Sequence, residues 1–132
     1  YAATKLKDKG INLLLEPINS KVDIPGFYLE TSAQALDIIK DVPSDNVFLQ
    51  YDVYHMQIME GDLARTMERC LDQIKHVQIA DHPGRHEPGT GEINYPYIFQ
   101  RLDEMGYQGW VSGEYKPLNT TESGLGWEKQ SI

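Results

Sequence analysis

The chain has 132 residues, and its 20 acidic and 12 basic side chains give a net charge of -8. A protein with this charge gains little from displacing the counterions of a phosphate backbone, so we expect no nucleic acid partner. The single cysteine, Cys70, excludes an internal disulfide and a zinc site built from several thiolates, and it predicts a reducing, cytoplasmic location. The longest apolar run, residues 11–15, is interrupted by Asn12 and is far shorter than the ~20 residues of a membrane span, so no membrane partner is expected.

The first elements that the sequence predicts are the end of a helix, a strand and a second helix. Residues 1–9 are polar with alanine, leucine and lysine, and Gly10 is a typical helix end. Residues 11–16 form a short apolar run closed by an acid and a proline, which is typical of a strand buried on both faces. After a loop rich in turn-forming residues, residues 32–40 carry apolar side chains at helical spacing. Because the chain begins within a helical segment, we expect it to be a piece of something longer.

The same alternation of strand and helix continues along the chain. We expect Asp62 to cap the helix that follows Gly61, and Gly106 to end the helix before the last strand. The expected elements are a strand at 47–52, a helix at 62–74, a strand at 76–80, a helix at 95–105, a strand at 110–114 and a further helix from Glu122. Strands that alternate with helices form right-handed βαβ units. The sequence therefore predicts an α/β fold with a parallel sheet, in one unit that covers residues 1–132.

Each predicted strand ends at a polar residue. These four residues are Glu16, Asp52, Gln78 and Glu114. The carboxyl ends of parallel strands meet at one edge of the sheet, where ligands bind. Carboxylate and amide oxygens suit Mg²⁺ or Mn²⁺ better than zinc or copper, and a cation would offset the repulsion between three carboxylates. The alternative is that each residue only marks the point where its strand meets solvent. This alternative is the better explanation for any single residue, but it is a weaker explanation for four polar residues at the same level of the sheet.

Two further side chains are candidates for substrate binding. His55 follows Asp52 after one short turn and could orient a substrate oxygen, although a surface histidine is an equally good interpretation. Arg85 follows a Pro-Gly pair, and its planar guanidinium is suited to a carboxylate, which an acidic protein can hold only at a local positive site. Lys116 could be a second contact, but a solvated lysine is the simpler interpretation. A solvated loop face is also the simpler interpretation for His82, His86 and Glu87.

Five segments of the chain carry a family resemblance. They are LLEPIN at 14–19, QYDVYH at 50–55, HVQIA at 76–80, PGRHEPGTGEI at 83–93 and GEY at 113–115. Together they resemble hydroxypyruvate isomerase, a family of the xylose isomerase-like TIM barrels, which also include sugar epimerases and endonuclease IV. The resemblance covers nearly the whole chain, and the PGRHEPGTGE run is its most specific part. Related sugar epimerases have a histidine ligand where this chain has Gln78, which favours the hydroxypyruvate branch.

The resemblance implies a metal-assisted isomerisation. The expected ion is Mg²⁺ or Mn²⁺, and its implied ligands are Glu16, Asp52, Gln78 and Glu114. The resemblance further implies that Glu16 and Glu114 carry the proton transfers, one removing a proton from C3 and the other returning one at C2. Hydroxypyruvate would become tartronate semialdehyde through an enediolate. His55 would hydrogen-bond a substrate oxygen and Arg85 would hold the carboxylate of this small anionic hydroxy-keto acid.

The length of the chain limits this interpretation. A complete (β/α)₈ barrel has roughly 250 residues, and the resemblance places this chain at the C-terminal half, strands five to eight. A half barrel has unpaired strand edges and an uncovered sheet face, which favour a homo-oligomer. Two alternatives stay open: a noncatalytic half-barrel that binds metal or associates with a partner, and a ketose 3-epimerase on the same scaffold. The acidic charge and the few histidines disfavour an endonuclease with three zinc ions.

Overall fold

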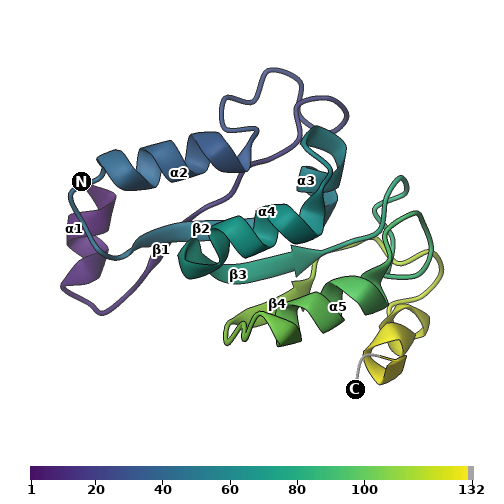
Figure 1. The fold of residues 1–132 in the computed structure, drawn as a ribbon. Coiled ribbons are helices and arrows are strands. Elements are labelled where there is room, and N and C mark those ends of the chain that lie inside the picture. The colour runs from purple at the N-terminus through teal and green to yellow at the C-terminus, as the bar shows by residue number, and fades with distance from the viewer. Residues whose placement is uncertain (131–132) are drawn as a thin grey trace.

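The fold is built on a sheet of four parallel strands in the order β1-β2-β3-β4 (Figure 1). The structure is a computed structural model, which describes residues 1–130 and the side chains of residues 1–127. The strands are β1 (Leu13–Leu15), β2 (Val47–Asp52), β3 (Ile74–Ile79) and β4 (Trp110–Gly113). Neighbours in the sheet are also neighbours in the sequence of strands, as expected for successive βαβ units. The predicted parallel sheet is confirmed.

Helices connect the strands. They are α1 (Ala2–Lys7), α2 (Ser32–Asp41), α3 (Val53–Met59), α4 (Leu63–Cys70) and α5 (Tyr95–Glu104), with short 3-10 segments η1 (Leu71–Gln73) and η2 (Ser123–Gln130). Local signals start two of them. Thr31 and Gln34 form a reciprocal capping box at the start of α2, and the Asn94 side chain accepts from the Tyr97 backbone at the start of α5.

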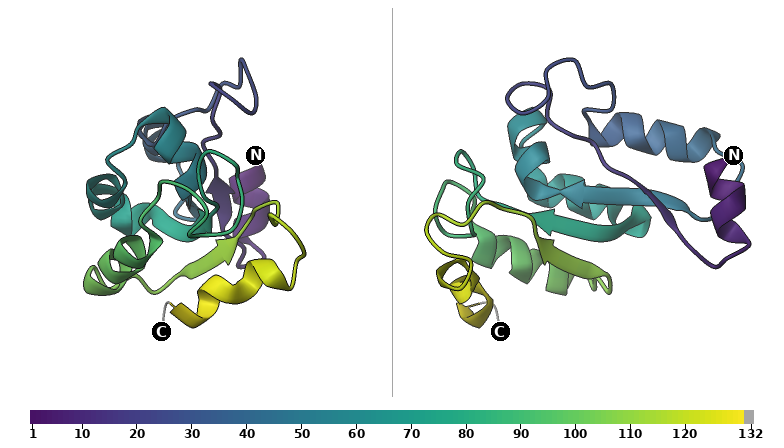
Figure 2. Two further views of the ribbon diagram at one scale, coloured as in Figure 1. Left: turned by 90° about the vertical axis from the view of Figure 1, so that its right-hand side faces the viewer. Right: turned by 180° about the vertical axis from the view of Figure 1, so that it is seen from behind.

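The hydrophobic core lies between one face of the sheet and the helices. Leu49 and Tyr51 of β2 are fully buried in it, together with Val77 and Ile79 of β3. Because side chains alternate along a strand, Gln50 lies on the opposite face. The right-hand view of Figure 2, which is turned by 180° from Figure 1, shows this opposite face, with the strands in front of α4 and α5. In the part of the chain that the structure describes, no helix has the length and apolar character needed to cross a lipid bilayer.

Several expected boundaries were wrong. Residues 53–59 form α3, which was not expected, because the helix follows β2 with no intervening turn. Asp62 precedes α4 in a left-handed conformation, but its side chain makes no cap hydrogen bond and pairs with Arg65 instead. The predicted helix 62–74 ends at Cys70, and β3 begins at Ile74 rather than at residue 76. The segment after Glu122 is a 3-10 helix in its described part.

Candidate functional site

The four strand-end residues lie at one edge of the sheet. Glu16 directly follows β1 and Asp52 is the last residue of β2. Asp52 is in register with Gln78 on β3. Glu114 follows β4, and its backbone N–H donates to the carbonyl of Ile79 at 3.0 Å, which continues the pairing beyond the strand. The parallel topology thus brings all four predicted ligands to the same edge.

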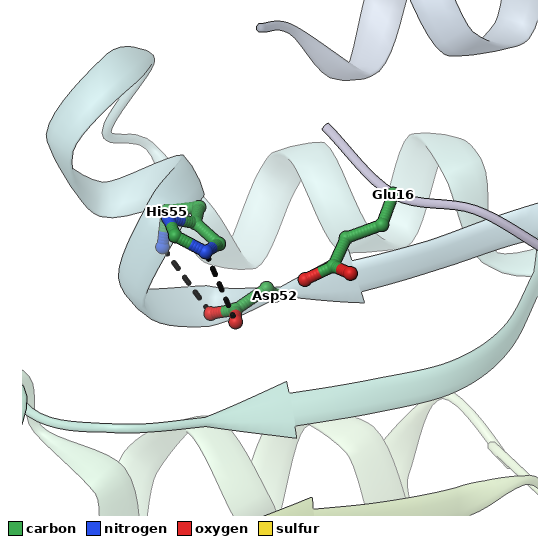
Figure 3. Close-up of side chains that lie close together, drawn as sticks. All are labelled: Glu16, Asp52 and His55. Carbon is green, nitrogen blue, oxygen red and sulfur yellow. Dashed lines mark hydrogen bonds and ion pairs between the residues drawn. The ribbon is translucent and has the colours of Figure 1, made fainter. Parts of the chain in front are cut away.

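The tightest group at this edge consists of Glu16, Asp52 and His55 (Figure 3). One ligand atom from each of these residues lies within 4.8 Å of the others. Asp52 Oδ1 caps α3 by accepting from the backbone N–H groups of Tyr54 and His55, at 2.8 and 3.2 Å. The same turn places His55 Nε2 3.7 Å from Asp52 Oδ2. The end of β2 and the start of α3 therefore set the geometry of two of the three side chains.

Glu16 and Asp52 are difficult to ionise together. Burial, followed by the charges of Asp52 and Glu114, raises the pKa of Glu16 to about 7. Burial also raises the pKa of Asp52 to about 6, although the two backbone hydrogen bonds at the start of α3 and the charge of Arg85 oppose this shift. A cation between these groups would stabilise both carboxylates and lower both pKa values. The donor set therefore fits a hard divalent ion, as oxygen ligands predict.

Gln78 and Glu114 lie nearby with other partners. Gln78 Oε1 accepts a hydrogen bond from Gln50 Nε2. The Glu114 side chain is 53% exposed, and its Oε2 lies 2.5 Å from Arg85 Nη2. Among the residues that the structure describes, Glu114 is not part of the 4.8 Å group. The predicted pairing of Glu16 with Glu114 around one ion stays a prediction.

Arg85 is held by residues that the sequence interpretation missed. Its Nη1 lies 3.2 Å from Oδ2 of Asp23, and its guanidinium carbon lies 5.1 Å from the centre of the Tyr54 ring. The Tyr54 hydroxyl donates to the other oxygen of Asp23 at 3.2 Å. These side chains and Lys116 line a cavity of about 470 Å³. Sixty-two residues separate Asp23 from Arg85, so no local pattern could have indicated the pair.

The loop that carries Arg85 folds around one buried carboxylate. Asp81 is 1% exposed and accepts from the backbone N–H groups of His82, Gly89 and Ile93. Three amide hydrogen bonds to one carboxylate close residues 81–93 into a defined shape, which gives the PGRHEPGTGE run a structural role. Arg85 itself has a φ of 52°, a left-handed conformation that is uncommon for this residue type.

The remaining polar residues of this loop have ordinary partners. His82 Nδ1 lies 2.8 Å from Glu92 Oε1, and His86 Nδ1 lies 2.7 Å from the carbonyl oxygen of Lys116. Glu87 accepts from the backbone N–H of Leu118 at 2.9 Å. These contacts tie the loop to its neighbours and to the segment after β4. They agree with the interpretation of these side chains as loop structure rather than as site residues.

The sequence matches the family described as xylose isomerase-like TIM barrel over residues 1–131. The chain belongs to this family. Hydroxypyruvate isomerase from Escherichia coli (strain K12) is 56% identical to it over 127 residues, which are 96% of this chain and 49% of that protein. A 2-oxo-tetronate isomerase from Cupriavidus necator is 45% identical over 129 residues, or 98% of this chain and 49% of that protein.

Solved structures agree with this assignment to the xylose isomerase-like TIM barrels. A crystal structure described as an AP endonuclease of family 2 from Brucella melitensis has a TM-score of 0.94 and 48% identity, and the match covers 98% of this chain and 50% of that chain. The 3-keto-D-glucoside 4-epimerase of E. coli has a TM-score of 0.85 and 29% identity, over 98% of this chain and 49% of that chain. The chain spans about half the length of the curated relatives it matches.

These findings confirm the predicted family and its fold. The similarity to hydroxypyruvate isomerase inferred from the sequence motifs is confirmed by the relative at 56% identity. The assignment to the second half of the xylose isomerase-like barrel, and the roles of the strand-end residues, stay predictions.

Proposed function

We propose that the protein containing this chain is a hydroxypyruvate isomerase, which interconverts hydroxypyruvate and tartronate semialdehyde. The observation that carries the proposal is the convergence of Glu16, Asp52 and His55 within 4.8 Å at the carboxyl edge of the sheet. The guanidinium of Arg85 lies close enough to lower the pKa of both carboxyls. Relatives named hydroxypyruvate isomerase and 2-oxo-tetronate isomerase support an isomerase that acts on an acid. We place it in the cytoplasm, because its single cysteine suits a reducing compartment.

The proposed cofactor is Mg²⁺ or Mn²⁺. Its ligands would be Glu16, Asp52, Gln78 and Glu114. Burial, together with the charges of neighbouring carboxylates, raises the pKa of Glu16 and Asp52, and this supports a cation at this position. When bound, the ion would supply positive charge for the oxygens of the carbonyl and hydroxyl groups as the enediolate forms.

The two glutamates supply the proton transfers. One glutamate takes a proton from C3 of hydroxypyruvate, and the other returns a proton at C2, so the C3–H bond breaks and a C2–H bond forms. The pKa of Glu16 is raised to about 7 without a metal ion and would fall when the ion binds, which favours the carboxylate form that can take a proton. The hydroxyl proton moves from the C3 oxygen to the C2 oxygen. His55 would hydrogen-bond one of these oxygens, since its Nε2 lies on the site side of the ring, next to Asp52.

Arg85 selects an acid as the substrate in this proposal. Its guanidinium is fixed by Asp23 on one side and by the Tyr54 ring beneath it. A carboxylate could replace Glu114 as the partner of Nη2 when Glu114 turns to the ion. A neutral ketose has no group for this interaction. The geometry therefore favours a 2-oxo acid over the substrate of a ketose 3-epimerase.

The test is an assay of the protein in its full length with Mg²⁺ or Mn²⁺. Tartronate semialdehyde formation from hydroxypyruvate is followed beside two other substrates, a four-carbon 2-oxo acid and a ketose. We expect turnover of hydroxypyruvate and a loss of about 10²–10⁴-fold in kcat for Glu114→Gln. Arg85→Met should raise KM for the acids and leave any ketose turnover unchanged. Unchanged turnover in Glu114→Gln would contradict the mechanism.

The same assay separates the alternatives. Turnover of the ketose alone would indicate a 3-epimerase. Metal binding or self-association without turnover of any substrate would indicate a noncatalytic half-barrel. We expect the 132-residue chain by itself to be prone to form a homo-oligomer, because Trp110 on the edge strand β4 is 79% exposed. Sedimentation of the isolated chain measures this property independently of activity.

A further inference from the structure

Gln50 lies between two of the predicted metal ligands without being one of them. It is on β2, two residues before Asp52, and therefore on the same face of the sheet. β1 is in register with β2 up to Leu15 and Leu49, so the next step places Glu16 beside Gln50. On the other side, β3 brings Gln78 to the same level as Asp52. A side chain at this position can reach both neighbouring strands.

The Gln50 amide contacts one of these predicted ligands directly. Its Nε2 donates to Oε1 of Gln78 at 2.5 Å. On the other side, the register of β1 and β2 brings Glu16 next to Gln50. The hydrogen bond links β2 to β3 at the level of the predicted ligands.

This hydrogen bond has a defined consequence for Gln78. A glutamine can bind a cation only through its carbonyl oxygen, because its NH₂ group carries no available lone pair. The N–H of Gln50 holds the Gln78 amide with its oxygen, rather than its nitrogen, toward Gln50 and the edge of the sheet where the predicted ligands lie.

We propose that Gln50 is a positioning residue of the metal centre, which presents the oxygen of Gln78. This inference rests on the proposed metal site. In this proposal Gln50 acts through Gln78 and does not contact the ion or the substrate. Partners of this kind typically contribute 10–100-fold to metal affinity.

The same face of the sheet offers a matched control. His76 Nε2 and the Ser112 hydroxyl lie 2.7 Å apart. His76 is in register with Gln50, and Ser112 is in register with Gln78, so this contact lies directly beside the Gln50–Gln78 pair. It also joins two neighbouring strands through half-buried side chains, but neither partner is a predicted ligand. Ser112→Ala therefore removes a comparable hydrogen bond at the same level of the sheet and leaves the one between Gln50 and Gln78 in place.

The experiment measures Mn²⁺ binding by calorimetry and by the electron paramagnetic resonance signal of free Mn²⁺. It uses the full-length protein, Gln50→Met, Gln50→Leu and Ser112→Ala. We expect both Gln50 variants to bind Mn²⁺ 10–100-fold more weakly and Ser112→Ala to bind it as the wild type does. Circular dichroism and thermal unfolding without metal identify any variant that has lost its fold. The second Gln50 variant keeps the test valid if one of them has.

A double-mutant cycle with Gln78→Met distinguishes positioning from general loosening. If Gln50 acts through Gln78, the loss in Mn²⁺ affinity of the double variant is smaller than the sum of the two single losses. Equal Mn²⁺ affinity in the wild type and both folded Gln50 variants would overturn the inference alone. Additive losses would also overturn it. A wild-type protein that binds no Mn²⁺ would overturn the proposed metal site itself.

Discussion

Asn19 fixes which nitrogen of His55 carries the ring proton. The backbone N–H of Asn19 and its side-chain NH₂ both approach Nδ1 of His55, at 3.3 and 2.7 Å. The orientation of the Asn19 amide is set by its oxygen, which accepts from the backbone N–H groups of Val22 and Asp23. Two donors meet at Nδ1, so Nδ1 accepts and the proton lies on Nε2. Burial, followed by the charge of Arg85, lowers the pKa of His55 to about 4, so the ring is neutral at pH 7.

Replacing this donor by a carboxylate should change the state of His55. In Asn19→Asp an acceptor faces Nδ1 in place of the NH₂ group, and its negative charge favours the imidazolium. We expect the pKa of His55 to rise above 4 and Nδ1 to gain a proton, as measured by ¹⁵N-resolved NMR of the histidine ring. Asn94→Asp is the control, since it adds the same charge at the exposed start of α5. An unchanged His55 titration in Asn19→Asp would contradict the assignment of the proton to Nε2.

The strands could be predicted from the sequence, and so could the residues at their ends. The strands are short runs with apolar residues, and each of the four predicted strands ends at a polar residue. The burial on both faces expected for residues 11–16 was wrong, because β1 is half-buried. The helix α3 could not be predicted in this way, because Asp52 is both the last residue of β2 and the N-cap of α3. No glycine or proline separates the two elements, so the pattern showed the end of the strand and not the start of a helix.

The residues that position the site could not be predicted from local patterns. Asn19 contacts His55 across 36 residues, and Asp23 contacts Arg85 across 62. Both lie in the irregular loop between β1 and α2, where no periodicity relates a side chain to its neighbours. Their types carried a weak signal at most, because asparagine and aspartate are also common turn formers. Only the folded arrangement of the loops brings them to the strand ends.

The loop that carries Arg85 should not tolerate a side chain at Gly91. A Cβ added there would lie well inside van der Waals contact with the carbonyl oxygen of His82 and near Oδ1 of Asp81. Since Asp81 anchors this loop, we expect Gly91→Ala to lower the free energy of unfolding by about 1–3 kcal/mol and to weaken substrate binding. Gly126→Ala is the control, because a Cβ there meets nothing within 4 Å. Urea unfolding of both variants measures the difference, and equal stability would contradict the described loop.

The stability of the metal-free protein should depend on the charge of Glu16. The pKa of this residue is about 7 in the folded chain, against 4.5 as its ordinary value. Between these values the folded state keeps a proton that the unfolded state releases, so the free energy of unfolding falls as the pH rises. Glu16→Gln removes this fall. We expect the free energy of unfolding of the variant to exceed that of the wild type by about 1–2 kcal/mol at pH 8, after allowance for solvent screening.

The measurement is urea unfolding at pH 5 and pH 8 with a chelator present. The difference in free energy of unfolding between Glu16→Gln and the wild type should be small at pH 5 and should reach about 1–2 kcal/mol at pH 8. With saturating Mn²⁺ the order should reverse, because an ion that binds only the folded wild type stabilises it. A variant that is less stable than the wild type at pH 8 without metal would show that Glu16 is not destabilised by its surroundings.

The last prediction concerns two buried tyrosines with opposite hydrogen bonding. The Tyr51 hydroxyl is buried in the core and has no hydrogen-bond partner among the described residues. Tyr95 is equally buried, but its hydroxyl donates to the carbonyl of Ala80 at 2.6 Å. Tyr51→Phe removes an unsatisfied polar group and keeps the ring, so the free energy of unfolding should rise by about 1 kcal/mol. Tyr95→Phe leaves the Ala80 carbonyl without its donor and should lower the free energy of unfolding by about 1–2 kcal/mol. Urea unfolding compares the two variants, which remove the same atom, and a loss of stability in Tyr51→Phe as large as in Tyr95→Phe would mean that the Tyr51 hydroxyl has a partner in solution.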